Sequence, residues 1–375
     1  MTRQIYMDHN ATTPMRPEVI EVVTAALARV GNPSSVHRFG RLARRAVEEA
    51  RERVGSAIGA APAEIVFVSG GSEANNLAVR GSGRPRLVAS AIEHDSVRAA
   101  GEFEPVPVDA GGVIDLGALD AMLAGDPRPA LVSVMLANNE TGAIQPVAEA
   151  ARIAHAHGAI LHCDAVQALG RIPLDVRRLG VDLLSLSAHK IGGPQGTGAL
   201  FVRDGLSLAS QIKGGGQERG RRAGTEAVAA IVGFGLAASA AATEIEDMAR
   251  IATLRDRLEA GVKRLAPSVR VFAEGAPRLP NTSCFAVTGL GAETQVMALD
   301  LAGIAVSAGS ACSSGRVRAS HVLEAMSADP ETAASAIRVS LGRQNDAADI
   351  DEFLAAWGAL LARHAAGASR AETAA

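Results

Sequence analysis

The stretch DLLSLSAHKIGGPQGTGALFV, residues 182–202, places one lysine between two apolar runs. The runs before and after it, 182–187 and 198–202, have the length and composition of buried strands. Lys190 therefore follows the end of a predicted strand, and the glycines after it allow a ligand to approach the backbone. The question is which chemistry needs an amine at that position.

Further strand-like runs alternate with helical patterns over the first two thirds of the chain. This alternation predicts βαβ units and an open, mainly parallel α/β sheet, which binds ligands at the carboxyl ends of its strands. From about residue 244 a long helix is followed by short strands and two more helices, which predicts a smaller α+β domain. The additional strand-like runs of the first part are EIVFVS (64–69), RLVASA (86–91), ALVSVMLA (130–137) and AILHC (159–163).

Composition and charge limit the classes of function. A chain of 375 residues is long enough for about two domains. The net charge is −3 and the arginines are dispersed, which argues against a nucleic-acid or membrane partner. The N-terminus has no apolar signal core, and the uncharged run between Glu226 and Glu244 reads as a buried helix. Three irregularly spaced cysteines indicate a reducing compartment, so we expect a cytoplasmic protein.

Polar residues follow five of the predicted strands. Because the carboxyl ends of parallel strands meet at one edge of a sheet, we expect these residues to converge on one site. They are SGGSEANN (69–76), EHD (93–95), NNETG (138–142), Asp164 with Gln167, and Ser187 to Lys190.

The surroundings of Lys190 suit a Schiff base with an aldehyde such as pyridoxal phosphate. That cofactor needs a carboxylate at its pyridine nitrogen, a ring stacker and a phosphate cup. Asp164 is the candidate carboxylate or else a helix N-cap, and His94 is the candidate stacker or else a loop histidine. Gly71 and Ser72, just ahead of a helical run, form either the cup or an ordinary N-cap.

The three cysteines differ in their surroundings. Cys312 lies in SAGSACSSG (307–315), a segment of small residues, which is the setting of a reactive thiol. Cys163 and Cys284 lie in apolar runs and are expected to be small core residues. His155, His157 and His162 lack a standard zinc spacing, so no metal site is predicted.

Nine segments of the chain, in order, carry a resemblance to a family. Over nearly its whole length the sequence resembles the group I cysteine desulfurases (NifS/IscS type) of the class V aminotransferase family, which are fold type I pyridoxal phosphate enzymes. The segments are YMDHNATTP, NPSSVHRFG, FVSGGSEANNLA, VSVMLANNETGAIQP, LHCDAVQALG, SLSAHKIGGPQGTGALFVR, KGGGQERGRRAGTE, AVSAGSACSSG and AIRVSLGR.

The resemblance implies an architecture of two domains. A large cofactor-binding domain, 15–246, would hold a mainly parallel seven-stranded sheet sandwiched by helices. A small domain, 1–14 and 247–366, would carry the nucleophile loop at about 305–318, and residues 367–375 are expected to be a disordered tail.

The resemblance also implies a role for each site residue. Lys190 would form the Schiff base with the cofactor and act as the catalytic base, and Asp164 would pair with its pyridine nitrogen. Arg338 would bind the substrate carboxylate, and Cys312 would be the catalytic nucleophile. The remaining implied roles are His94 as a catalytic residue stacked on the ring, Gln167 and Asn139 at the ring oxygen and substrate, Gly71, Ser72, Ser187 and His189 at the phosphate, and Thr225 reaching in from a partner subunit.

The implied activity is conversion of L-cysteine to L-alanine, with the sulfur left as a persulfide on Cys312 for an acceptor. The family is a homodimer with composite sites. A selenocysteine lyase, an aminotransferase and a docking scaffold of a sulfur-transfer complex are the competing interpretations. The acceptor stays open between an iron–sulfur scaffold, a tRNA-thiolation relay and a molybdenum-cofactor enzyme.

Overall fold

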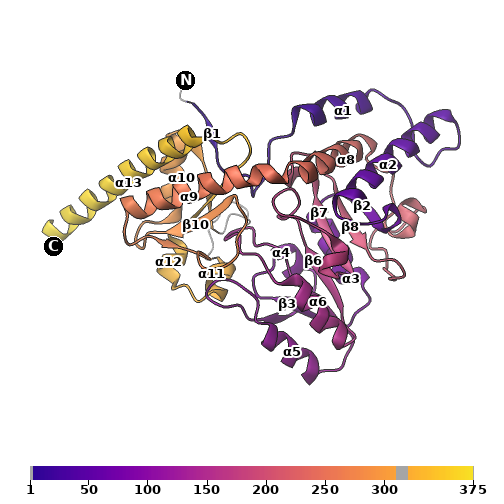
Figure 1. Cartoon of the computed structure of the whole chain (residues 1–375), viewed down its shortest axis with the longest axis horizontal. Helices are drawn as coiled ribbons and strands as arrows, with labels where there is room; N and C mark the ends of the chain where they lie inside the picture. Colours follow the sequence, from indigo (N-terminus) through magenta and orange to yellow (C-terminus); the bar gives the residue numbers. More distant parts are fainter. Residues whose placement is uncertain (1–2, 310–319, 375) are drawn as a thin grey trace.

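The computed structural model describes residues 3–309 and 320–374, with side chains as far as residue 366. Its central element is a seven-stranded sheet in the order β2-β8-β7-β6-β5-β3-β4 (Figure 1). All neighbouring strands run parallel except β8, which is antiparallel to both β2 and β7. The predicted mainly parallel seven-stranded sheet is therefore confirmed. The strands are β2 (Ile65–Val68), β3 (Arg86–Ser90), β4 (Glu104–Val106), β5 (Ala130–Ser133), β6 (Ile160–Asp164), β7 (Leu183–Ser187) and β8 (Gly198–Val202).

Both faces of this sheet are buried, which explains why its strands are continuous apolar runs. On β2, for example, Ile65 and Phe67 pack into one core, and Val66 and Val68 pack into the other. The flanking helices are α1 (Pro17–Leu27), α2 (Arg38–Ala57), α3 (Gly71–Gly81), α4 (Asp95–Arg98), α5 (Leu116–Gly125), α6 (Val147–Ala156), α7 (Val176–Leu179) and α8 (Val228–Thr243).

Helix α8 is the buried helix predicted from the uncharged run. It lies against α2 so closely that a Cβ on Gly235 would stand 2.7 Å from the Cα of Ala50. Among the described residues no single helix is long and apolar enough to cross a membrane. Only α8 taken together with residues 245–265 passes that test, and the pair is bent by 58°.

The small domain is built on a four-stranded antiparallel sheet in the order β12-β13-β10-β9. The N-terminal strand β1 pairs in parallel with β11, so the first residues of the chain belong to this part of the molecule. The elements are β1 (Ile5–Tyr6), β9 (Arg270–Val271), β10 (Thr282–Ala286), β11 (Ile304–Ala305), β12 (Ser307–Ala308), β13 (Ala336–Ser340), α9 (Met248–Leu265), α10 (Ala292–Leu301), α11 (His321–Ala325), α12 (Pro330–Ala334) and α13 (Ala347–Ala374).

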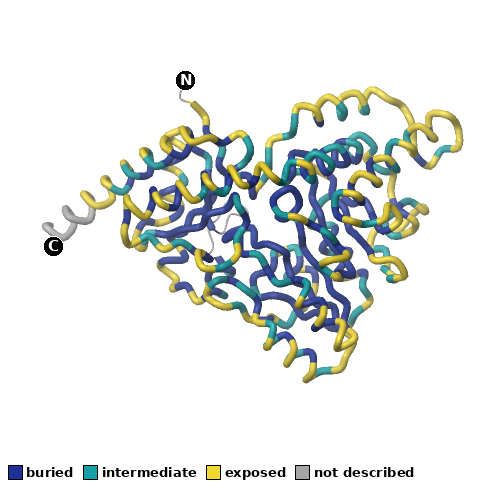
Figure 2. Tube along the Cα trace, viewed as in Figure 1, coloured by how far each residue is buried: buried dark blue, intermediate teal, exposed yellow. Residues whose placement is uncertain are grey.

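Two of the four apolar cores among the described residues follow this arrangement, and a third, which includes Met135 and Cys284, joins the two domains. The core of the large sheet includes residues from Val19 to Ala241, whereas a second core joins Ile5 and Met7 to residues from Met248 to Leu360. Figure 2 shows the buried trace along the large sheet and within the small domain. These cores support the domain boundary at residue 246, which we propose on this basis.

The C-terminus differs from the expectation of a disordered tail over 367–375. Helix α13 continues to Ala374 and extends away from the small domain (Figure 1). The stretch lacks the apolar period of a packed helix, but it is rich in alanine, the residue with the highest helix propensity. The alanine content was the signal for a helix here, and a search for an apolar period alone does not detect it.

Candidate active site

A cavity of ≈ 350 Å³ lies at the carboxyl ends of the strands, where the two domains meet. The five groups of polar residues predicted to converge all contribute to its wall, and the N-terminal segment and the small domain complete it. Its polar lining consists of Asp8, Asn10, Ser72, Asn75, His94, Ser96, Asn139, Asp164, Gln167, Ser187, His189, Lys190, Ser307 and Arg338.

Lys190 ends a short 3-10 turn that follows β7. Its Nζ donates hydrogen bonds to the backbone carbonyls of Asn10 and Ala11. The Asn10 carbonyl also accepts a hydrogen bond of 3.0 Å from Nε2 of Gln167. The Asn10 carbonyl thus contacts both the candidate Schiff-base amine and the side-chain amide of Gln167, which was predicted to lie at the ring oxygen and the substrate.

Asp164 is the last residue of β6, and its carboxylate is buried in the cavity wall. Its Oδ2 accepts a hydrogen bond of 2.7 Å from Asn75, and its Oδ1 accepts one of 2.9 Å from the backbone of Val166. The neighbouring Glu93 is fully buried, and burial together with the charge of Asp164 raises the pKa of Glu93 well above its usual range. Glu93 therefore keeps its proton to a higher pH than an exposed glutamate does, which limits the negative charge beside Asp164.

His94 is the N-cap of α4, and its ring is held from one side. Its Nδ1 accepts a hydrogen bond of 3.1 Å from the backbone N–H of Ser96 and lies 2.7 Å from the Ser96 hydroxyl. Because Nδ1 accepts from a backbone amide, the proton of the neutral ring is assigned to Nε2. The orientation of the ring is set before any ligand binds.

The start of α3 has the features of an anion site. Its N-cap, Gly70, has φ 158° and no side chain, so the first amides of the helix have no side-chain cap. A Cβ on Gly71 would stand 2.7 Å from a methyl group of Val166, which excludes a larger residue. Burial, followed by the charges of Lys190 and Arg171, lowers the pKa of His189 to about 4, so this histidine enters the site as a neutral donor.

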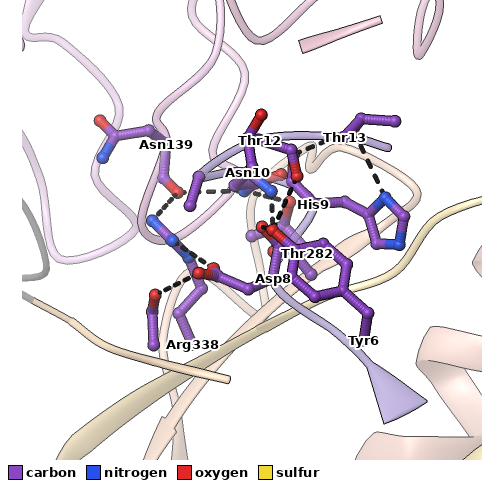
Figure 3. A network of polar contacts seen from close by, with 12 residues as sticks. Tyr6, Asp8, His9, Asn10, Thr12, Thr13, Asn139, Thr282 and Arg338 are labelled. Carbon is purple, nitrogen blue, oxygen red and sulfur yellow. Dashed lines mark hydrogen bonds and ion pairs between the residues drawn. The ribbon is translucent and has the colours of Figure 1, made fainter. Parts of the chain in front are cut away.

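Arg338 lies on β13 and is almost completely buried. Its guanidinium donates a hydrogen bond of 2.7 Å to Oδ1 of Asp8 and one of 3.1 Å to the backbone carbonyl of Asn139 (Figure 3). Its Nε is buried and has no hydrogen-bond partner among the described residues. Such a donor suits the carboxylate of a ligand.

Cys312 lies outside the described residues. The described chain stops on either side at Gly309 and Ser320, and both are close to Glu140 of the cavity loop. The Ser320 hydroxyl donates a hydrogen bond of 2.6 Å to Oε2 of Glu140, and a Cβ on Gly309 would stand 3.6 Å from the same oxygen. Burial raises the pKa of Glu140 to about 7.

The other sequence predictions lie away from this cavity. Thr225 does not line it, and its predicted place is in the cavity of a second subunit. Cys163 and Cys284 are buried, and burial raises the pKa of both thiols. The three histidines weighed for metal binding contact separate partners: His155 contacts Asp182, His157 contacts Asp120, and His162 contacts Ser133 and Ser185.

Sequence reasoning assigned no role to Asp8, Asn10 or Asn75, which all line the cavity. Asp8 and Asn10 belong to YMDHNATTP, a polar segment that ends no predicted strand. Asn75 lies three residues after Ser72 on a predicted helix, a spacing that places both on one face. That spacing was the available signal for Asn75.

The cavity fits pyridoxal phosphate by the chemistry of its donors. An amine, a fixed carboxylate, an oriented imidazole and an uncapped helix N-terminus surround one volume. Each is one of the parts that the cofactor requires.

Three comparisons with known proteins bear on this site. Residues 5–353 match the model of the family described as aminotransferase class-V. The chain is 45% identical to a cysteine desulfurase of Cereibacter sphaeroides, with 94% of each chain covered. It is 41% identical to the cysteine desulfurase IscS of Dictyoglomus turgidum, covering 94% of this chain and 93% of the other. A NifS-like protein from Rickettsia africae has a similar structure, with a TM-score of 0.88, 37% identity and coverage of 95% and 98%.

Proposed function

The chain belongs to the class V aminotransferase family and is a pyridoxal phosphate-dependent cysteine desulfurase, and we propose that it moves the sulfur of L-cysteine to Cys312 in the cavity around Lys190. The observation that carries the proposal is that Lys190, Asp164 and Arg338 line one cavity. The described chain on both sides of Cys312 ends beside Glu140, at Gly309 and Ser320, and Glu140 directly follows the cavity residue Asn139.

Each part of the cofactor has a proposed holder. Lys190 would bind its aldehyde carbon, Asp164 would accept a hydrogen bond from its pyridine nitrogen, and His94 would stack on its ring. Gln167 and Asn139 lie on the side of the ring oxygen and the substrate. When bound, pyridoxal phosphate supplies an electrophilic carbon for the substrate amine and a ring that delocalises the electron pair left at Cα. Gly71, Ser72, Ser187 and His189 would hold the phosphate, joined by Thr225 of the partner subunit.

The Lys190 amine, once exchanged for that of the substrate, accepts the proton from Cα. Two backbone carbonyls, of Asn10 and Ala11, accept hydrogen bonds from Nζ. Carbonyl oxygens at that position stabilise the ammonium that results from proton uptake. Lys190 then holds the proton within the cavity.

Arg338 orients the substrate through its carboxylate. Its buried Nε and the remaining N–H groups of its guanidinium offer a planar fork that matches a carboxylate. The Cys312 thiolate then attacks the sulfur of the substrate: an S–S bond forms, and the Cβ–S bond breaks with its electron pair on Cβ. Protonation of that carbon gives alanine, and the persulfide stays on the enzyme.

We further propose that the enzyme is a cytoplasmic homodimer that hands its sulfur to an acceptor or scaffold protein. The homodimer is supported by a stretch of exposed apolar side chains over α1, the following loop and the start of α2. Isolated apolar side chains are ordinary at a surface, but six exposed ones between residues 20 and 42 favour an interface. The residues are Ile20, Leu27, Val30, Val36, Phe39 and Leu42.

The test of the proposed function uses the purified protein loaded with pyridoxal phosphate. Wild type should release alanine from L-cysteine and carry one persulfide on Cys312, whereas Cys312→Ala should keep the cofactor absorbance and release no alanine. Equal alanine release by the two proteins would contradict the assignment of Cys312. Loss of the cofactor absorbance only in Lys190→Ala would support the assigned role of Lys190.

A further inference from the structure

The carboxylate of Asp8 contacts two residues that are neighbours across the β12–β13 pair. Its Oδ1 accepts a hydrogen bond of 2.7 Å from Arg338, and its Oδ2 accepts one of 2.8 Å from the Ser307 hydroxyl. Ser307 and Arg338 are register partners on these strands. One carboxylate therefore bridges the substrate-binding arginine and the strand that precedes the Cys312 segment.

The backbone around Asp8 is fixed to the same sheet. Ser340 donates its backbone N–H to the carbonyl of Met7 at 2.8 Å and accepts from the backbone N–H of His9 at 3.1 Å. The Tyr6 hydroxyl donates a hydrogen bond of 3.0 Å to the backbone carbonyl of Asp8 (Figure 3). Because the residues on both sides of Asp8 are paired, its side chain has little freedom to leave the guanidinium.

Asp8 leaves part of the guanidinium open. Of the five N–H groups of an arginine, one meets Asp8, one meets the carbonyl of Asn139, and the Nε group has no partner among the described residues. A ligand carboxylate can therefore bind Arg338 without displacing Asp8. The ligand carboxylate and the Asp8 carboxylate then both interact with the same guanidinium.

We propose that Asp8 is a positioning residue of the substrate site: it fixes the plane of the Arg338 guanidinium and, as a resident anion, lowers the affinity for the substrate carboxylate. The inference rests on the proposed role of Arg338. The orienting role and the effect of the charge can be tested separately, because asparagine at position 8 keeps the acceptor oxygen and removes only the negative charge. With asparagine at this position, the Ser307 hydroxyl can rotate from donor to acceptor, so the contact with β12 is also kept.

The experiment titrates the cofactor-loaded enzyme with L-alanine or with ethylamine, following the absorbance of the cofactor. Ethylamine has the amine and lacks the carboxylate, so it reports every effect that does not pass through Arg338. Asp8→Asn should bind L-alanine about tenfold more tightly, because repulsion between two nearby, partly screened charges is removed. Its affinity for ethylamine should stay unchanged. Asp8→Ala also loses the acceptor, so its turnover of L-cysteine should fall below that of Asp8→Asn.

Unchanged L-alanine affinity in Asp8→Asn, or a parallel change for ethylamine, would overturn the inference. Arg338→Met separates this failure from a failure of the proposed function. If Arg338→Met weakens L-alanine binding and Asp8→Asn has no effect, only the role of Asp8 is wrong. If Arg338→Met binds L-alanine as tightly as wild type, the assignment of Arg338 fails, and the inference fails with it.

A second variant covers the case in which Asp8→Asn does not fold. Ser307→Ala removes the hydroxyl donor from Oδ2, so the carboxylate interacts more strongly with Arg338. L-Alanine should then bind two- to threefold more weakly, with ethylamine unchanged. Unchanged L-alanine binding in this variant would also count against the inference.

Discussion

The side-chain amide of Asn75 donates a hydrogen bond of 2.7 Å to Oδ2 of Asp164 and one of 2.8 Å to the Ser96 hydroxyl. Ser96 in turn contacts Nδ1 of His94. A single amide on α3 thus links the carboxylate proposed for the pyridine nitrogen to the histidine proposed for the ring. The two proposed cofactor contacts are oriented together, from a helix whose N-terminus is also the proposed phosphate site.

We expect Asn75→Ala to weaken the affinity for pyridoxal phosphate about tenfold, because two site residues lose a buried hydrogen-bond partner. The measurement is the dissociation constant of the cofactor, taken from its absorbance. The melting temperature of the cofactor-free protein is the control. A loss of affinity that merely parallels a loss of melting temperature would contradict a role in orienting Asp164.

A second prediction concerns the buried ion pair between Arg51 of α2 and Glu218. Two hydrogen bonds of 2.7 and 2.8 Å join the guanidinium to the carboxylate, and both side chains are almost fully buried. Glu218→Ala should lower the free energy of unfolding by about 3 kcal/mol, since the buried guanidinium then keeps only the partly exposed Glu48 as an ionic partner. Urea denaturation measures this change.

The control for that prediction lies on the same helix. Arg45 and Glu49 form an exposed pair at 2.7 Å, with side chains 77% and 50% exposed. Arg45→Ala should therefore change the free energy of unfolding by less than about 0.5 kcal/mol. Similar losses in Arg45→Ala and Glu218→Ala would show that burial of the Arg51 pair is not what matters.

A third prediction concerns the dependence of stability on pH through Glu140. Burial raises the pKa of Glu140 from 4.5 to about 7. Between these values the folded protein holds a proton that the unfolded chain has released, so the free energy of unfolding falls as the pH rises from about 4.5 to 7. The contribution is about 3 kcal/mol, present at pH 4.5 and lost above pH 7.

Glu140→Gln isolates this contribution because glutamine keeps an acceptor for Ser320. The variant and wild type should be equally stable near pH 5, and the variant should be more stable at pH 8. Burial lowers the pKa of His9, His162 and His189 to about 4, which destabilises both proteins equally as the pH falls below about 6.5. A difference between the two proteins that does not vary with pH would refute the prediction.

The sequence predicted the fold well because its signals are local. Runs such as 130–137 and 182–187 are apolar without alternation, and both faces of the sheet are indeed covered. Strand β4 was not predicted, since it has three residues, one of them Pro105, and lies at the edge of the sheet. Edge strands of this length carry no periodic signal.

From the residue pattern alone, the site was predicted only where its residues follow strands of the large sheet, whereas Arg338 of the small domain was predicted from the family resemblance. Asp164 and Lys190 do so, and parallel topology alone brings such residues together. Asp8 and Asn10 reach the cavity because β1 pairs with β11, which is about 300 residues away in the sequence. Glu218, which pairs with Arg51, and Asp8, which pairs with Arg338, are likewise distant from these arginines in the chain, and no local pattern encodes those two contacts.

The last prediction tests the composite site of the proposed homodimer. Lys190→Ala removes the Schiff-base amine from a subunit's own cavity, and Thr225→Val removes the hydroxyl that the subunit contributes to its partner. In a mixed dimer of the two variants, one cavity has both defects. The other has Lys190 from the Thr225→Val subunit and Thr225 from the Lys190→Ala subunit, so it is intact. We expect co-expressed variants to form mixed dimers with about half the wild-type alanine release, well above the sum of the two homodimers. Activity no greater than that sum, with mixed dimers demonstrated by two different affinity tags, would show that each subunit completes its own site.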